Sequence, residues 1–194
     1  ATVSPLNKNS WATALAEAAF MTGLERNADV VHMTSYAPLM AHVEAWQWAP
    51  NMIWFDNLRS LPTANYVVQK LFSNNRGAEV VSITANGKAL IGQDELYASA
   101  VRDTDKSIII KLVNTAAVDK TLALQANNKA LEGTATITTL GNANLEAENS
   151  FANPKVIHPV VTKQKFNTNR DIKIPAQTLM VIKLANKQRN EEIN

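Results

Sequence analysis

The hydrophobic positions near the start of the chain recur at helical intervals. In residues 11–26, Trp11, Leu15 and Ala18 fall on one face of a helix. Ser10 stands immediately before them, where a helix N-cap is expected. The segment therefore predicts a helix that packs one apolar face against the rest of the molecule.

A strand and a second helix are predicted next. Residues 29–36 begin with nearly continuous apolar residues, which is typical of a parallel strand buried on both faces. Residues 65–74 predict a helix, and Gly77 can end it. The intervening segment of about 25 residues contains three tryptophans and three prolines and predicts a loop. A structureless loop of this length inside a domain is usually either functional or a misassigned segment.

Several segments in the second part of the chain alternate apolar and polar residues with the period of a strand, for example residues 134–140. Turn-forming pairs such as Asn86-Gly87 and Gly141-Asn142 separate the alternating segments. Short strands at this spacing predict an antiparallel β-sandwich. The seven candidate strands are residues 79–84, 96–102, 107–114, 120–126, 135–140, 156–165 and 178–185.

The predicted strand at residues 29–36 has no partner strand in its own part of the chain. A parallel strand needs neighbours on both sides to satisfy its backbone hydrogen bonds. Residues 1–78 are therefore expected to be a piece of a larger α/β fold. We expect Val30, Val31 and Met33 either to pair with a second copy of the chain or to tuck onto the sandwich. A homo-oligomer is one of the assemblies that this predicts.

Composition narrows the classes of function. Hydrophobic residues make up 46% of the 194 residues and charged residues 19%, which predicts a folded domain rather than a disordered chain. The net charge of +2 creates no strong field, so neither nucleic acid nor a membrane is expected as a partner. The absence of cysteine excludes disulfides, thiolate zinc sites and a cysteine nucleophile. No motif for a cofactor is present, and none is expected.

Three pairs of titratable side chains are the candidates for a metal site or for acid–base chemistry. His32 and His42 have no carboxylate at the spacing of metal ligands, so they are expected to pack or to face solvent rather than bind a metal. Glu17 and Glu25 stand two turns apart on a predicted helix, and both are expected to be solvated. Glu146 and Glu148 lie in a polar loop that lacks the Asp-Gly pattern of a calcium site. These pairs are His32 and His42, Glu17 and Glu25, and Glu146 and Glu148.

The strongest chemical feature is the predicted loop between the strand and the second helix. It holds Trp46, Trp48 and Trp54 within nine residues, beside amides and carboxylates. Flat indole faces stack on the C–H faces of sugar rings, while amides bond to their hydroxyls. The alternative is an aromatic cluster that only packs the loop. If the preceding strand belongs to a barrel, the loop leaves its C-terminal end, where barrel enzymes place their active sites.

Several segments resemble the α-L-arabinofuranosidases of glycoside hydrolase family 51. These are residues 14–39, from Ala-Leu-Ala-Glu-Ala to Tyr-Ala-Pro-Leu, then Trp46-Gln-Trp48 and residues 53–57, Ile-Trp-Phe-Asp-Asn. Residues 174–184, Ile-Pro-Ala-Gln-Thr-Leu-Met-Val-Ile-Lys-Leu, resemble the closing strand of that family's C-terminal β-sandwich. The resemblance covers roughly residues 10–186 and implies a (β/α)8 barrel followed by a β-sandwich.

The resemblance also implies how the segments are placed. Residues 29–36 would be the eighth barrel strand, between the helices that precede and follow it. Residues 1–78 would then be the C-terminal end of a catalytic barrel, residues 79–187 a β-sandwich domain, and residues 188–194 a frayed tail. The fold class is expected to be α+β and mainly β, a remnant of a (β/α)8 barrel (helix-strand-helix) followed by an antiparallel β-sandwich.

The function implied by the resemblance is retaining hydrolysis of terminal α-L-arabinofuranosyl groups from arabinan or arabinoxylan. Such enzymes use two glutamates about 5–5.5 Å apart. Both would lie upstream, the nucleophile shortly before Ala1, so no catalytic residue is expected here. Glu17 and Glu25 do not take these roles, and the chain alone is expected to be inactive. Its partners would be an arabinose-containing saccharide and the remainder of the barrel.

The substrate-binding candidates are Trp46, Trp48 and Asn51. The tryptophans would form the pocket wall or an adjacent subsite. Asn51 aligns loosely with a family position that contacts substrate and is commonly glutamine. The alternative function is a sandwich that binds carbohydrate without catalysis or serves as a scaffold, although the sandwich has few aromatic residues for a sugar platform. A periplasmic or extracellular location is favoured over a cytoplasmic one.

Overall fold

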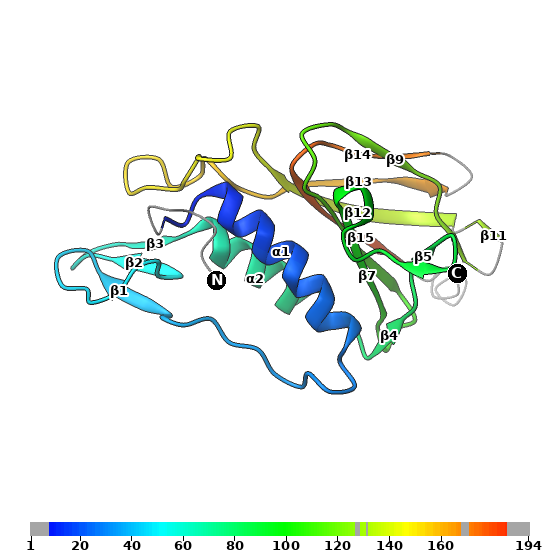
Figure 1. The fold of residues 1–194 in the computed structure, drawn as a ribbon, viewed down its shortest axis with the longest axis horizontal. Coiled ribbons are helices and arrows are strands. Elements are labelled where there is room, and N and C mark those ends of the chain that lie inside the picture. The colour runs from blue at the N-terminus through cyan, green and yellow to red at the C-terminus, as the bar shows by residue number, and fades with distance from the viewer. Residues whose placement is uncertain (1–7, 127–128, 131, 168–170, 186–194) are drawn as a thin grey trace, which may run out of the picture.

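The computed structural model describes residues 8–126, 129–130, 132–167 and 171–185. It contains one large antiparallel sheet, with two helices packed against one of its faces (Figure 1). A separate small sheet lies on the side where the first helix begins. The large sheet has six strands in the order β13-β12-β15-β8-β7-β4. Its members are β4 (Glu79–Val81), β7 (Leu96–Arg102), β8 (Ile108–Asn114), β12 (Glu132–Gly141), β13 (Val160–Asn167) and β15 (Thr178–Leu184).

The two faces of the large sheet bury alternate residues of the same strands. On β8, Ile109 and Val113 pack under the helices, whereas Ile110 and Leu112 pack on the opposite side. This is the two-residue period of a strand that is covered on both faces. Each fully buried side chain of this size stabilises the fold by about 1.5–3 kcal/mol. The sheet is therefore the central layer of the molecule.

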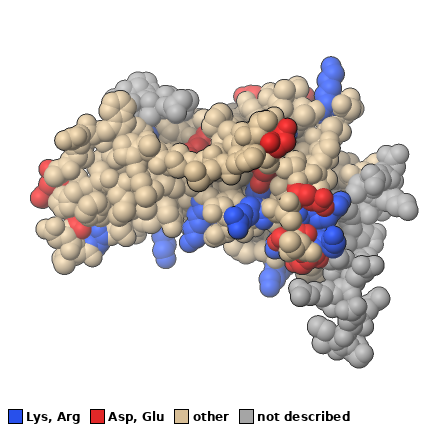
Figure 2. Space-filling model, turned by 90° about the horizontal axis from the view of Figure 1, so that it is seen from below, with Lys and Arg blue, Asp and Glu red and all other residues tan. Residues whose placement is uncertain are grey.

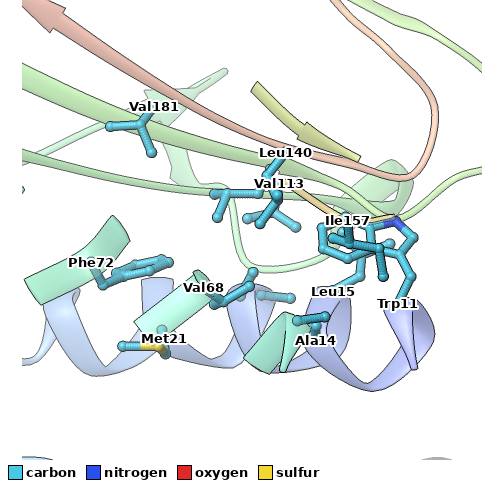
Figure 3. Packing of buried hydrophobic residues seen from close by; sticks show 14 of the residues in the cluster. Trp11, Ala14, Leu15, Met21, Val68, Phe72, Val113, Leu140, Ile157 and Val181 are labelled. Atoms are coloured by element: carbon cyan, nitrogen blue, oxygen red, sulfur yellow. The ribbon is translucent and has the colours of Figure 1, made fainter. Parts of the chain in front are cut away.

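Two helices cover one face of the sheet. Helix α1 (Trp11–Arg26) and helix α2 (Ala64–Asn74) lie side by side and contribute small and aromatic residues to a common core with the sheet. In Figure 3, Trp11, Leu15, Val68 and Phe72 point from the helices towards the strands above them. The proposed domain boundary at residue 78 stays a prediction. The buried core runs across it.

Short strand pairs cover the opposite face of the sheet. Strand β9 (Lys120–Leu122) pairs with β14 (Ile172–Ile174), and Leu122 and Ile172 pack against this second core. The prediction of a mainly β fold with an antiparallel sandwich is confirmed. The other short elements are β5 (Thr84–Ala85), β6 (Lys88–Ala89), η1 (Gln93–Glu95), β10 (Gln125–Ala126) and β11 (Lys129–Ala130).

The strand predictions differ from the structure mainly at their ends. The strand at residues 96–102 is confirmed with the same bounds, and the one at 107–114 begins one residue later. The strand expected at 156–165 begins at Val160 instead. The predicted strand at 79–84 ends at Val81 because the chain turns into a separate small hairpin. The frayed tail predicted at residues 188–194 lies outside the described residues.

The first helix has the predicted bounds but is capped differently. Ser10 is the N-cap residue, yet its side chain makes no capping hydrogen bond. The backbone N–H of Trp11 donates to the Ala147 carbonyl and that of Ala12 to the Leu145 carbonyl, each at 2.8 Å. Two of the free N–H groups of the first turn are thus satisfied by the loop between β12 and β13, which the sequence pattern did not indicate.

The strand predicted at residues 29–36 is wrong for this chain. The backbone turns after α1, with the N–H groups of Val30 and Val31 donating to the Asn27 carbonyl at 3.0 and 2.8 Å. Residues 31–36 continue without pairing to any described strand. A parallel strand forms only where neighbouring strands supply both ladders, and the described chain supplies none at this place.

The prediction that this segment tucks onto the sandwich is also wrong. Val30 is 72% exposed and Met33 is 89% exposed. Val31 is half-buried. In Figure 1 the segment runs apart from the large sheet, along the opposite side of the helices. Pairing with a second copy of the chain stays a prediction.

The predicted loop between the strand and the second helix contains a small sheet instead. Strand β1 (Met40–His42) pairs in parallel with β2 (Ile53–Phe55), which pairs antiparallel with β3 (Ser60–Pro62). Each strand has only three residues, too few to show a hydrophobic period. The second helix then begins at Ala64, one residue before its predicted start. Its N-cap Thr63 accepts from the Tyr66 N–H and donates to the Met52 carbonyl on the segment leading into β2.

Gly77 does not end α2, because the C-cap residue is Asn75. The glycine is needed for a close approach to strand β7. A Cβ atom at this position would lie 2.7 Å from both the Arg102 carbonyl oxygen and the Val101 Cβ. A side chain here would force the connection between α2 and β4 away from the sheet.

Candidate functional site

The small sheet presents two of the predicted sugar-binding residues to solvent. Trp46 and Trp48 lie between β1 and β2, and their side chains are 52% and 63% exposed. Trp54 on β2 is half-buried and meets Trp46 edge to face, with ring centroids 5.9 Å apart and an interplanar angle of 89°. The half-buried indole of Trp54 thus supports the exposed indole of Trp46. An edge-to-face contact of this kind leaves an aromatic face open.

Asn51, the third predicted contact, is buried at 1% exposure. Its side-chain Nδ2 donates to the Trp48 carbonyl at 2.5 Å. The amide therefore holds the backbone that carries the more exposed tryptophan. A loop whose bend is fixed by such a bond presents its side chains with little loss of conformational entropy on binding.

The turn between β2 and β3 is fixed by a carboxylate. Asp56 Oδ1 accepts from the backbone N–H groups of Leu58 and Arg59, at 2.8 and 2.6 Å, while Oδ2 accepts from the Arg59 guanidinium. The hydrogen bond from Leu58, followed by the one from the Arg59 side chain, holds the pKa of Asp56 below its ordinary value. The Arg59 guanidinium carbon in turn lies 4.8 Å from the centre of the Phe151 ring.

A second polar cluster lies between the two helices. Glu17 on α1 accepts hydrogen bonds from the side-chain amides of Asn65 and Gln69 on α2. Asn65 also accepts from Asn9, which donates to the Tyr36 hydroxyl at 3.2 Å. Burial raises the pKa of Glu17 more than these amides lower it. The prediction that Glu17 is solvated is therefore wrong, because the residue faces the second helix.

Replacing Glu17 with glutamine should flatten the dependence of stability on pH. Above its ordinary pKa of 4.5, the folded chain retains the Glu17 proton more readily than the unfolded chain does. The free energy of unfolding therefore falls as pH rises from 4.5 towards the raised folded-state pKa. Urea unfolding at pH 4 and pH 7 should show a smaller fall for Glu17→Gln than for the wild type. The exposed Glu146→Gln is the matched control, and equal falls in all three proteins would contradict the assignment.

Glu25 is also not solvated. Its carboxylate bonds to the Lys111 ammonium, 2.5 Å away, and accepts from the Ser99 hydroxyl at 2.5 Å. Lys111 itself is fully buried, donates to the Asn75 carbonyl and lies over the Phe72 ring. Burial lowers the pKa of Lys111, and the nearby Glu25 charge opposes that shift. These groups join α1, α2 and the sheet at one point.

The remaining metal candidates have local partners. His32 is exposed beside the Asp29 carbonyl, and His42 lies 3.3 Å from the Asn57 side chain and edge to face with Phe55. Glu148 pairs with Lys8 at 3.7 Å. Within the part of the chain that the structure describes, no three His, Asp or Glu side chains gather as they would around a metal ion. No described helix is both long and apolar enough to cross a membrane.

A cavity of about 690 Å³ separates the two helices from the segment that follows α1. Its walls include Met21 and Leu24 of α1, Phe72 of α2, and Met33 and Tyr36 of the segment. The exposed apolar residues of the segment and this cavity lie together. The large sheet covers one side of α1 and α2, whereas their other side is only partly covered. A partly exposed apolar surface of this kind is typical of a site of association.

Comparison with known proteins relates this chain to α-L-arabinofuranosidases. A family model described as the α-L-arabinofuranosidase C-terminal domain matches residues 2–177. An extracellular exo-α-L-arabinofuranosidase of Streptomyces chartreusis is 60% identical over 73 residues, which are 38% of this chain and 9% of that protein. α-L-Arabinofuranosidase A of Aspergillus niger is 31% identical over 172 residues, 87% of this chain and 26% of that protein. The chain thus spans about a quarter or less of the length of these curated relatives.

Solved structures show the same fold. An arabinose-bound α-L-arabinofuranosidase of glycoside hydrolase family 51 matches 92% of this chain and 28% of its own, with 30% sequence identity and a TM-score of 0.80. The α-L-arabinofuranosidase of Thermotoga maritima, in complex with arabinose, matches 91% of this chain and 39% of its own, with 17% identity and a TM-score of 0.75. At that identity the second match concerns the fold alone.

Proposed function

Since the chain belongs to the family of α-L-arabinofuranosidase C-terminal domains, we propose that it works as the C-terminal portion of a family 51 α-L-arabinofuranosidase. The enzyme would remove terminal arabinofuranosyl groups from arabinan or arabinoxylan. The observation that carries this proposal is the family match, which extends over both helices and most of the sandwich. The length of the relatives supports a larger working enzyme.

In this proposal residues 1–78 close a catalytic barrel. The segment that follows α1 would pair with the strands of the remaining barrel and become the eighth strand. Its exposed Val30 and Met33 and the neighbouring cavity support this role, because a barrel would cover both. In the left part of the face shown in Figure 2, the charged side chains lie mainly near the edges and the area between them is uncharged, as a surface covered by other parts of an enzyme would be.

The catalytic glutamates would come from the remainder of the barrel. A retaining glycosidase needs an acid/base and a nucleophile about 5–5.5 Å apart. Glu17 and Glu25 are engaged in contacts between helices and sheet, so their carboxylates do not serve this purpose. An extracellular location for the enzyme is proposed by analogy with the Streptomyces relative, whose name states it.

The test of this function is the natural gene product. Its intact mass and its hydrolysis of p-nitrophenyl α-L-arabinofuranoside should be measured beside those of the isolated 194-residue chain. We expect a natural protein several times longer that releases p-nitrophenol, and no turnover by the isolated chain. A natural species of only 194 residues with turnover would overturn the proposal. So would a longer natural protein without activity on arabinofuranosides.

Trp46 and Trp48 are the proposed sugar contacts, and Asn51 is proposed to hold Trp48 in place. A stacked indole contributes about 0.5–1.5 kcal/mol, so Trp46→Ala and Trp48→Ala should each raise KM for an arabino-oligosaccharide about two- to tenfold. Leu58→Ala is the matched control, because Leu58 belongs to the same small sheet region and is 93% exposed. An unchanged KM in both tryptophan variants would contradict the assignment.

The sandwich is proposed to act as a scaffold rather than as a separate sugar-binding module. One face of its large sheet is covered by α1 and α2 through a continuous apolar core. Residues 79–187 alone would expose that face, so they are poorly suited to work as a free module. Binding of arabinan by an isolated 79–187 chain would favour the binding module instead.

A further inference from the structure

The loop between β12 and β13 forms a closed lobe. Asn149 is buried, and its side chain donates to the Ile157 carbonyl at 3.0 Å and accepts from the Ile157 N–H at 2.8 Å. These two bonds close the stretch of residues 150–156 between them, and Ile157 itself is 1% exposed. The two hydrogen bonds fix the geometry at the base of this loop. We call residues 142–158 the lobe.

The lobe is anchored to α1 at one end. The carbonyls of Ala147 and Leu145 accept from the first N–H groups of the helix. Ile157 belongs to the same buried core as Trp11 (Figure 3). The lobe therefore has a fixed position relative to both α1 and the large sheet.

The other end of the lobe touches the small sheet. Phe151 is half-buried, and its ring faces the Arg59 guanidinium at 4.8 Å. The Arg59 side chain is also bound to Asp56, because its Nε and Nη2 donate to Asp56 Oδ2 at 3.0 and 2.7 Å. A guanidinium held by a carboxylate and stacked on an aromatic ring is a well-defined contact. In Figure 1 the lobe, drawn in yellow, extends towards the same end of the molecule as β1–β3.

A continuous series of contacts connects this point to the sugar-facing residues. Asp56 and Arg59 form the turn between β2 and β3, and β2 carries Trp54. The Trp54 ring meets Trp46 edge to face. We propose that Phe151 and Arg59 are positioning residues, through which the sandwich fixes the small sheet and with it the indole of Trp46 that contacts the arabinosyl substrate. This inference rests on the proposed function of Trp46.

The test compares Phe151→Leu, which removes the aromatic face but keeps an apolar side chain, with Phe151→Tyr, which restores it. In the ¹⁵N-labelled 194-residue chain, Phe151→Leu should shift or broaden the indole N–H resonances of Trp46 and Trp54. The Trp11 resonance should stay in place. Phe151→Tyr should return the wild-type spectrum. Leu58→Ala, in the same turn as Arg59, is the control that should leave the resonances unchanged.

The kinetic part uses the natural gene product with the same substitutions. A cation–π contact at this exposure is worth about a two- to fivefold change, so Phe151→Leu should raise KM for arabinotriose by that factor with kcat unchanged. Wild-type resonances or a wild-type KM in Phe151→Leu would overturn the inference alone. So would failure of Phe151→Tyr to restore them. A natural gene product without arabinofuranosidase activity would instead overturn the proposed function, and the inference with it.

Discussion

Replacing Lys111 with alanine is expected to destabilise the isolated chain by about 3–5 kcal/mol. The lysine is fully buried in the middle of β8, where its ammonium bonds to the Glu25 carboxylate and the Asn75 carbonyl. The Glu25 side chain is only 14% exposed, so its charge would lose its ionic partner without gaining full hydration. The loss would be measured by urea unfolding followed by far-ultraviolet circular dichroism.

Two further variants separate the unpaired charge from lost packing. Lys111→Met keeps the length of the side chain, and combining it with Glu25→Gln removes both charges. The double variant should be more stable than Lys111→Met alone, because no buried carboxylate is left without its cation. Lys163→Ala, on the exposed strand β13, should change the free energy of unfolding by less than about 0.5 kcal/mol. A cost of Lys111→Ala as small as that of Lys163→Ala would contradict the buried pair.

Local sequence patterns were sufficient where an element's own residues determine it. Helix α1 and strand β7 have their predicted bounds because the run of apolar residues that each one buries is contained in its own segment. Residues 29–36 have the composition of a buried parallel strand, but a strand also needs neighbours. The described chain does not supply them, so the same residues lie exposed. That these residues form a strand within a larger barrel stays part of the proposal.

Contacts between residues far apart in the chain had no signal in the sequence. Lys111 follows three isoleucines in a strand that is buried on both faces, and nothing near it in the sequence indicates Glu25, 86 residues earlier. Phe151 lies in the loop between β12 and β13, and its partner Arg59 lies far earlier in the chain, in the turn between β2 and β3. The candidate site was predicted at Trp46 and Trp48 because three tryptophans stand close in sequence. Asn51 and Trp54 were also named from the sequence, but their contacts with Trp48 and Trp46 could only be found in the structure.

Replacing Trp11 with alanine is expected to cost about 3–5 kcal/mol of stability. The indole is fully buried between α1 and the sheet, and its Nε1 donates to the Gln177 carbonyl at 2.8 Å. Trp11→Phe keeps most of the packing and loses the hydrogen bond, so it should cost less than the alanine variant. Thermal and urea unfolding of the isolated chain would measure both.

Trp48→Ala is the informative comparison for Trp11→Ala, because it removes the same side chain from a position that is 63% exposed. If Trp48 contacts sugar, its loss should change the free energy of unfolding by less than about 0.5 kcal/mol while raising KM in the natural gene product. If the tryptophans only pack the loop, the two variants should instead lose comparable stability. A loss of stability in Trp11→Ala without one in Trp48→Ala would assign Trp11 to the core of the domain. The same result would support Trp48 as a sugar contact rather than a packing residue.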